Sequence, residues 1–245
     1  MFACRDNTSA EAGRVDLAFT DRHGGVSTEP FDTFDLSRSR PGHDDELQTN
    51  LAVLATEFGV SGFATMLQVH GADVVGVSAP GPVSTPCDAL ITTEVDVALC
   101  VRVADCTPVV LADAVHGVVG VAHAGRPGVV AGVVPATVSA MRERGADNIE
   151  AWIGPRVCGG CYEVPSSMRD EVAAVVPAAY ACTTWGTPSV DIGAAVHHQL
   201  LVAGCTVYDR GRCTMESTDL YSYRRDKERS GRFAGVVVRR GPRRE

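Results

Sequence analysis

Three side chains with metal-binding chemistry each follow an apolar run of the sequence. Cys106 and His123 lie in LCVRVADCTPVVLADAVHGVVGVAHAG, residues 99–125, and His70 lies upstream in LQVHGADV. Side chains at strand ends are where a rigid sheet presents chemistry to solvent. Two imidazoles and one thiolate suit a zinc ion whose fourth position stays open for water or substrate. The sequence therefore predicts a metal site at His70, Cys106 and His123.

The spacing of these three residues and the pattern of the remaining cysteines are weaker evidence for a metal site than the residue types are. The intervals between positions 70, 106 and 123 match neither a zinc finger nor an HExxH helix, so the fold must bring the three side chains together. Cys158 and Cys161 form CGGC, which is either redox-active or half of a zinc site. Because the chain has no second CxxC, we expect this pair to be structural or incidental.

Hydrophobic periodicity predicts the elements that must position these side chains. Four apolar residues at helical spacing precede Gly59, which predicts a helix over 44–58. The Pro-rich segment 79–86 is expected to be a surface loop. Further helices are predicted over 126–144, with Pro135 as a kink or a new start, over 166–176, and over 191–203 with Asp191 as N-cap. Strands are predicted over 15–19, 64–69, 72–78, 88–93, 97–103, 108–112, 117–122, 148–153, 206–208 and 232–239.

The order of these elements bounds the fold class. Strands and helices are mixed without strict βαβ alternation, and the chain has neither GxGxxG nor GxxxxGK[ST]. This pattern predicts an α+β fold, a sandwich of mixed β-sheets flanked by helices, and not a Rossmann fold. With 245 residues, the chain is at the upper end of a single domain, so we expect one domain over 1–245.

Composition narrows the partners and the compartment. A formal charge of −8 and 6% aromatic residues argue against nucleic acid and anionic membranes as partners. The sequence has no signal-peptide pattern and no apolar run long enough for a bilayer, so we expect a soluble, cytoplasmic protein. The nine cysteines are scattered and odd in number, which disfavours a disulfide framework. Only segment 224–245 is basic, either as a solvated terminus or as an anion-binding edge.

Several short motifs resemble one known family in their order along the chain. They are LQVHGADV, DALIT, VRVADCTPVVLAD, VAHAG, GP at Gly154, YEV at Tyr162, CT at Cys213, and YSYRRD followed by GR at Gly231. This order resembles the YfiH/YlmD family, which is also described as a polyphenol oxidase or laccase domain, as purine nucleoside phosphorylase-like, and as a peptidoglycan editing factor. The resemblance extends from Gly24 to the final predicted strand.

The resemblance implies a metal, usually taken as zinc, at the positions of His70, Cys106 and His123. It also implies phosphorolysis of adenosine, inosine, guanosine and methylthioadenosine, and deamination of adenosine. The laccase description fits the residues poorly, because a trinuclear copper cluster needs several His-X-His pairs, and this chain has seven histidines and no such pair. A single copper ion could still occupy the same three ligands.

Two positions depart from the family pattern. The family commonly reads HAGWRG, whereas this chain reads HAGRPG, with Arg126 and Pro127 at the usual Trp and Arg positions. The family's Asn in the segment after GVS corresponds to Asp35 in TFDLS. These departures put the choice of substrate, and catalysis itself, in question.

Further residues are predicted to complete the site. Asp105 could steer a proton or orient a ligand imidazole. Arg225 and Arg232 are candidate phosphate anchors, and Arg126 could replace the displaced family Arg. Gln68 shares its strand face with His70 and could contact the base or the sugar. Asn50 lies on the predicted helix near the GVS loop, as a substrate contact or as a solvated helix residue.

We expect a zinc-dependent purine nucleoside phosphorylase whose partners are a nucleoside and phosphate, with adenosine deamination as a second activity. Two alternatives remain open. One is a hydrolase that edits peptidoglycan precursors, and the other is a metal- or nucleoside-binding module that has lost catalysis.

Overall fold

The central strands carry apolar residues on both faces, so both faces are buried. In β7 (Ala98–Val103), Leu99, Val101 and Val103 enter one hydrophobic cluster, whereas Ala98 and Cys100 enter another. Successive side chains of a strand point to opposite faces, so a strand with apolar side chains on both faces must be covered on both sides. The computed structural model, which describes residues 1–10, 13–38 and 42–241, provides that cover with a second sheet on one side and helices on the other.

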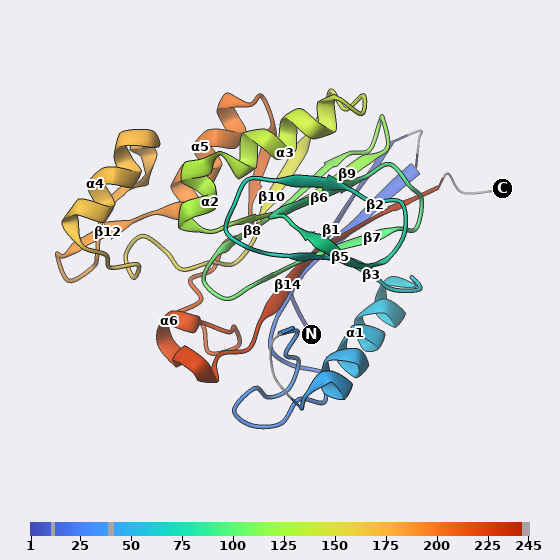
Figure 1. Ribbon diagram of the computed structural model, residues 1–245, viewed down its shortest axis with the longest axis horizontal. Helices are drawn as coiled ribbons and strands as arrows, with labels where there is room; N and C mark the ends of the chain where they lie inside the picture. Colours follow the sequence, from blue (N-terminus) through green and yellow to red (C-terminus); the bar gives the residue numbers. More distant parts are fainter. Residues whose placement is uncertain (11–12, 39–41, 242–245) are drawn as a thin grey trace.

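Two six-stranded mixed sheets form the centre of the molecule (Figure 1). The first has the strand order β1-β2-β14-β7-β3-β5, and the second has the order β13-β10-β8-β9-β6-β4. The strands of the first sheet are β1 (Phe2–Ala10), β2 (Gly13–Thr20), β14 (Phe233–Arg240), β7, β3 (Phe63–Leu67) and β5 (Gly81–Pro86). Those of the second are β13 (Thr206–Asp209), β10 (Glu150–Ile153), β8 (Thr107–Asp113), β9 (Val118–Ala124), β6 (Ala89–Thr92) and β4 (Val74–Gly76). A small hairpin pairs β11 (Tyr180–Cys182) with β12 (Pro188–Val190).

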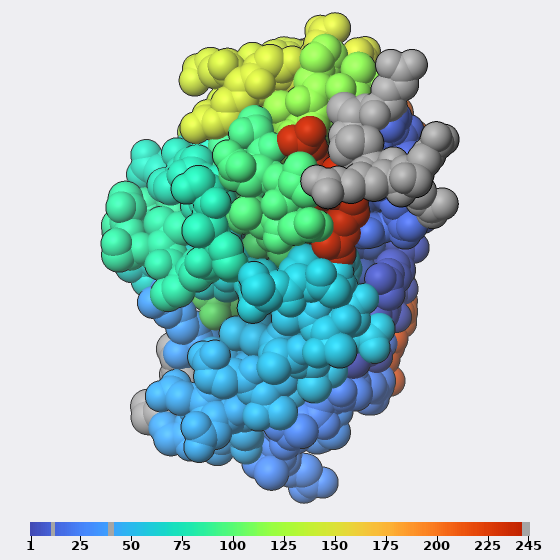
Figure 2. Space-filling view, turned by 90° about the vertical axis from the view of Figure 1, so that its right-hand side faces the viewer, coloured from blue at the N-terminus to red at the C-terminus, as the bar shows by residue number. Residues whose placement is uncertain are grey.

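Helices cover the outer faces of both sheets. Helix α1 (Asp44–Phe58) packs on the first sheet through Leu54 and Phe58. The second sheet is covered by α2 (Arg126–Ala131), α3 (Val133–Arg142) and α5 (Ile192–Val202), and α4 (Ser166–Val175) lies beyond them against the β11–β12 hairpin. Short helical turns are α6 (Tyr223–Asp226), Pro177–Ala179 and Lys227–Arg229. The side view in Figure 2 shows α1 in light blue across the lower part of the molecule, and red residues from the C-terminal part of the chain between green and blue segments.

This arrangement confirms the predicted α+β sandwich of mixed sheets flanked by helices. The predicted helix over 44–58 is present with the same bounds, and Gly59 ends it with a left-handed backbone (φ 59°). The Asp191 side chain caps α5 as predicted, by accepting a hydrogen bond from the Ala194 N–H. No described helix has the length and apolar character needed to cross a membrane. Part of the basic segment, 242–245, lies outside the described residues.

The structure corrects the sequence analysis at three local points. Segment 79–86 contains β5, because the edge of a sheet accepts prolines that do not need to donate a hydrogen bond. Strand β1 was not predicted, because its residues are mostly polar and show no apolar pattern. Such a composition is typical of an edge strand, and β1 forms the other edge of the same sheet. The predicted interruption of the helix over 126–144 is present, but the break is at Gly132 (φ 87°), and Pro135 sits in the first turn of α3.

A buried carboxylate holds the turn between β8 and β9. Asp113 is fully buried and accepts hydrogen bonds from the N–H groups of Val115, His116, Asp147 and Asn148 and from His116 Nδ1. Burial raises the pKa of this carboxyl, but these donors outweigh burial and hold it below its ordinary value of 3.8. The stabilisation is therefore present at neutral pH and is lost as the pH falls below about 4.

We expect Asp113→Asn to lower the free energy of unfolding by about 2 kcal/mol, because the charge-assisted bonds are weakened. Urea denaturation at pH 7 measures this change, and the difference from the native protein should shrink as the pH is lowered to 3. An unchanged unfolding midpoint would show that the carboxylate contributes nothing to the turn.

Candidate functional site

The three predicted ligands come from neighbouring ends of secondary-structure elements. Cys106 directly precedes β8, and His123 lies near the end of β9. The two strands are antiparallel neighbours in which Pro108 pairs with His123, so the thiol and the imidazole emerge at the same edge of the second sheet. His70 is in the loop between β3 and β4, with a left-handed backbone (φ 62°).

The ligand atoms of His70, Cys106 and His123 all lie within 4.8 Å of one another. The distance between His70 Nε2 and Cys106 Sγ is 3.7 Å, and the two imidazole rings are 4.7 Å apart at 68°. In a tetrahedral zinc site, a nitrogen ligand and a sulfur ligand are about 3.6 Å apart. The predicted set is thus brought together at a spacing that fits one zinc ion. A Cβ at Gly125 would lie 2.6 Å from the His70 ring, so only glycine leaves room here.

Asp88 organises both imidazoles. Its carboxylate accepts a 2.7 Å hydrogen bond from His123 Nδ1, which leaves Nε2 of that ring for the site. The same carboxylate accepts the backbone N–H groups of Val69, His70 and Gly71 at 2.7–3.1 Å. Burial raises the pKa of Asp88, but these donors together lower it, so the carboxylate stays charged at neutral pH.

The role of orienting an imidazole was predicted for Asp105, and the structure corrects this. The Asp105 carboxylate accepts from Thr214 Oγ1 at 2.6 Å and from the backbone N–H of Arg224 at 2.6 Å. It lines the cleft but is bonded to neither ring. Asp88 appeared in the sequence only within the motif DALIT. A lone carboxylate directly before a buried apolar strand was the signal available for it.

The thiol and the buried imidazole change each other's protonation. Burial of the sulfur raises its pKa, but the imidazoles of His123 and His70 outweigh burial and lower the pKa of Cys106 to about 6. Burial lowers the pKa of His123, whereas the charges of Cys106 and Asp88 raise it to about 9. The metal-free site therefore favours a thiolate beside an imidazolium at neutral pH.

This pairing predicts how the metal-free protein reacts with an alkylating agent. After treatment with a chelator, Cys106 should be carboxymethylated by iodoacetate with a rate that rises through a midpoint near pH 6, since the thiolate is the nucleophile. Burial raises the pKa of Cys87, Cys100 and Cys205, so these thiols should react only at high pH. Peptide mapping by mass spectrometry measures each rate. A Cys106 midpoint above pH 8 would contradict the pairing.

The triad opens into a cleft of about 1080 Å³ between the sheets' edge and α6. Two carboxylates, Asp105 and Glu228, line this cleft. Six cationic side chains also line it: Arg38, Arg102, Arg126, Arg224, Lys227 and Arg232. An excess of positive charge in one cleft of a chain with net charge −8 marks it as a site for an anion. Of the six, Arg126 and Arg232 were predicted from the sequence.

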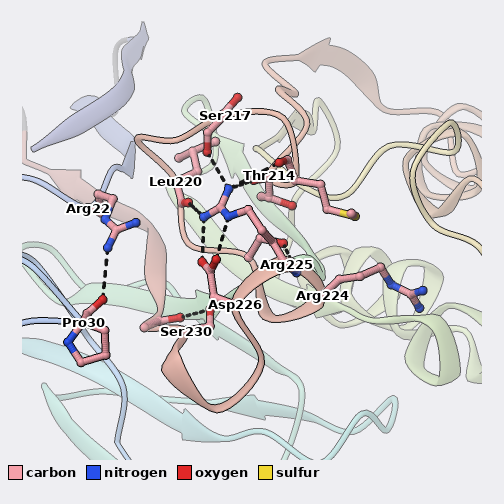
Figure 3. A network of polar contacts seen from close by, with 12 residues as sticks. Arg22, Pro30, Thr214, Ser217, Leu220, Arg224, Arg225, Asp226 and Ser230 are labelled. Atoms are coloured by element: carbon pink, nitrogen blue, oxygen red, sulfur yellow. Dashed lines mark hydrogen bonds and ion pairs between the residues drawn. The ribbon is translucent and has the colours of Figure 1, made fainter.

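The predicted phosphate anchor Arg225 is not in this cleft. Its guanidinium donates to the carbonyl oxygens of Thr214, Ser217 and Leu220 and is paired with Asp226 at 2.7 Å (Figure 3). Every strong donor is thus used to hold the loop before α6. The prediction of Arg225 as an anion ligand is wrong, because the arginine faces backbone carbonyls rather than solvent.

Asn50 is also structural rather than a substrate contact. The residue is fully buried, accepts from the Val26 N–H, and donates to Ser27 Oγ and to the Asp35 carbonyl oxygen. Asp35, the departure from the family's Asn, accepts from the backbone N–H of Arg232 at 2.8 Å. Both residues therefore shape the loop beside the cleft without lining it.

The remaining predicted contacts do line the cleft. Gln68 is there, but its amide exchanges two hydrogen bonds with the backbone of Arg102, at 2.8 and 3.1 Å, which fixes its orientation. Arg232 donates to the carbonyl oxygens of Ser230 and Gly231. The side chain of Arg126, at the start of α2, forms no hydrogen bond or ion pair with any described residue. Its guanidinium is therefore available to a ligand near the triad.

Comparisons with known proteins bear on the same region. A family model described as multi-copper polyphenol oxidoreductase laccase matches residues 16–240, which include all three triad residues. A purine nucleoside phosphorylase of Streptomyces coelicolor is 53% identical over 230 residues, which cover 90% of this chain and 94% of that protein. A purine nucleoside phosphorylase of Streptomyces griseus is 47% identical over 240 residues, with coverage of 94% and 96%. The crystal structure of YlmD from Geobacillus stearothermophilus shares 28% identity with a TM-score of 0.81, covering 94% of this chain and 93% of that one.

Proposed function

Because the chain belongs to the family of the multi-copper polyphenol oxidoreductase laccases, to which the YfiH and YlmD proteins belong, we propose that it is a zinc-dependent purine nucleoside phosphorylase. The family resemblance found in the sequence is confirmed. The observation that carries the proposal is the cleft in which a triad of two imidazoles and one thiol faces a group of cationic side chains. The names of the two Streptomyces relatives support the same reaction.

His70, Cys106 and His123 would hold the zinc ion, with copper as the alternative occupant. When bound, such an ion supplies a Lewis acid that polarises whatever ligand completes its coordination. The multi-copper description does not extend to the chemistry proposed here, because the chain has seven histidines and no His-X-His pair.

The cationic side chains would hold and position phosphate. In phosphorolysis, a phosphate oxygen forms a bond to the ribose C1′, and the bond from C1′ to the purine nitrogen breaks with its electron pair leaving on the base. Arg126 has free donors near Cys106, and Arg224 and Arg232 line the same cleft. These guanidiniums would neutralise the phosphate and hold it in line with the bond that breaks. Arg126, which departs from the family pattern, would thus take over an anchoring role.

We expect Arg126→Ala to raise the KM for phosphate at least about 10-fold with a smaller effect on kcat, because a charge-assisted contact to the anion is removed. Steady-state kinetics at varied phosphate measure this split. Arg229→Ala is the matched control, since Arg229 is an exposed arginine of the neighbouring turn that does not line the cleft. Equal effects of the two substitutions would remove Arg126 from the site.

Product analysis tests the reaction itself. Purified protein is incubated with adenosine or inosine, with and without inorganic phosphate, and the bases, nucleosides and ribose 1-phosphate are quantified. The proposal expects free base together with an equal amount of ribose 1-phosphate, both dependent on phosphate. Inosine formed from adenosine would support deamination, which the sequence analysis expects as a second activity. Base release without phosphate dependence would contradict phosphorolysis. So would absent nucleoside turnover combined with release of amino acids from a muramyl-peptide precursor.

A further inference from the structure

A second cluster of metal-binding side chains lies apart from the triad. The sulfur atoms of Cys158, Cys161 and Cys213 and a carboxylate oxygen of Glu216 all lie within 4.8 Å of one another. Cys161 Sγ is 3.6 Å from Glu216 Oε1. Sulfur ligands of one tetrahedral zinc ion are about 3.8 Å apart, so a single ion could contact all four groups.

The sequence pattern of this cluster is that of a four-ligand zinc site. The first pair is Cys158-x2-Cys161, and the second pair is Cys213-x2-Glu216. Structural zinc sites commonly use two short pairs of this spacing, and a carboxylate is an accepted zinc ligand. The second pair is easily overlooked, because Glu216 takes the place of a fourth cysteine.

The first pair sits on a tight turn that the surrounding structure enforces. The N–H groups of Cys161 and Tyr162 both donate to the Cys158 carbonyl oxygen at 3.0 Å. Close packing requires the first of the two intervening glycines and leaves little room for a side chain at the second. A Cβ at Gly159 would lie 2.8 Å from Asp191, and one at Gly160 would lie 3.1 Å from Thr184. The CGGC turn is therefore held in place before any ion binds.

The second pair is held equally firmly. The Cys158 N–H donates to Cys213 Sγ at 3.5 Å, which already joins the two halves of the cluster. Arg225 holds the loop that carries Cys213 and Glu216, through the carbonyl oxygens of Thr214 and Ser217 (Figure 3). Arg225 therefore has a role outside the proposed phosphate site, because it preorganises the second pair of ligands.

We propose that Cys158, Cys161, Cys213 and Glu216 form a second, structural zinc site, separate from the His70–Cys106–His123 site. Four protein ligands leave no open position, which is the arrangement of a zinc ion that stabilises structure. Three thiolates and a carboxylate are a ligand set that zinc accepts readily.

A redox-active dithiol fits the cluster less well. Burial and the neighbouring Cys213 thiol raise the pKa of both Cys158 and Cys161, whereas a reactive dithiol needs a thiol of lowered pKa.

The second site supports the first one through Asp105. The Asp105 carbonyl oxygen accepts from the Val157 N–H at 3.0 Å, directly before the CGGC turn. Its carboxylate accepts from Thr214 Oγ1 at 2.6 Å, directly after Cys213. Asp105 has a left-handed backbone (φ 79°) and is followed by the ligand Cys106. An ion that locks the two loops together thus fixes the backbone on which Cys106 is presented.

Metal stoichiometry and cobalt spectroscopy test this proposal without reference to activity. Protein is stripped of metal under reducing conditions and titrated with Zn²⁺ or Co²⁺. The wild type should bind two equivalents, and Cys106→Ala should still bind one, with a thiolate-to-cobalt charge-transfer band about three-quarters as intense as that of the wild type. Cys161→Ser should lose the second equivalent and most of that band. Cys182→Ser, at an exposed cysteine outside both clusters, is the matched control and should bind two.

The Cys106→Ala variant keeps the test decisive even where Cys161→Ser does not fold. Zinc should raise the thermal unfolding temperature of Cys106→Ala, because a ligand that binds only the folded state stabilises that state. One equivalent in the wild type and none in Cys106→Ala would overturn the second site while leaving the first intact. A disulfide between Cys158 and Cys161 in protein purified without reductant, with no second equivalent after reduction, would overturn it as well. One equivalent retained in Cys106→Ala, together with the loss of one of two equivalents in Cys161→Ser, supports the second site, whatever the outcome for the proposed phosphorylase.

Discussion

Replacing Cys106 with alanine should lower the rate of purine nucleoside phosphorolysis by at least about 1000-fold, since loss of a Lewis acid removes several kcal/mol of transition-state stabilisation. The sulfur lies 3.7 Å from His70 Nε2, and without it the two imidazoles alone must hold the ion. Fold and stability should change little, because Cys106 lies at the cleft rather than deep in a hydrophobic cluster.

The measurement is the initial rate of base release at saturating phosphate, together with the metal content of the same sample. Cys182→Ser serves as the control for removal of a thiol and should retain full activity. A Cys106→Ala variant with wild-type turnover would exclude the thiolate from the reaction.

Replacing Asp88 with asparagine should weaken zinc binding at the triad about 10- to 100-fold, which is the usual effect of losing the partner of a ligand imidazole. The Asp88 carboxylate accepts from His123 Nδ1 and from three consecutive backbone N–H groups around His70, so it positions two ligands at once. The Asn side chain is isosteric but uncharged, and its NH₂ group cannot accept these donors.

Competition of the protein with a chromophoric chelator measures the zinc affinity. Asp113→Asn is a matched control, because Asp113 also binds a histidine Nδ1 and several backbone N–H groups but lies away from the cleft. The control should lose stability while keeping the wild-type zinc affinity of the triad. If both substitutions change the affinity equally, the effect comes from general destabilisation and not from the orientation of His123.

The elements that depend on local pattern were the ones that the sequence predicted well. Helix α1 has both an apolar stripe and a terminating glycine, and β8 and β9 are short apolar runs bounded by polar residues. The edge strands β1 and β5 have neither signal, since only a neighbouring strand defines them. Sequence periodicity reports which faces are buried, and an edge strand has little to bury.

The site was predictable in its ligands but not in the groups that hold them. His70, Cys106 and His123 stand out by chemical type at strand ends. Asp88 is one of many aspartates, and its importance arises only when the fold brings His123 and the loop at His70 to it. Arg225, in contrast, was predicted as a phosphate anchor although it is structural. The carbonyl oxygens that bind it belong to an irregular loop that no periodicity describes. Contacts between residues far apart in sequence decided each of these cases.

The most direct test of the central claim is a crystal structure with anomalous diffraction recorded above and below the zinc absorption edge, from crystals soaked with phosphate and a nucleoside. The account predicts an ion bonded to Cys106 Sγ and to the Nε2 atoms of His70 and His123, with the nucleoside and phosphate in the cleft beside Arg126. A zinc-loaded crystal with no peak among these three side chains, or with the nucleoside bound outside this cleft, would contradict it.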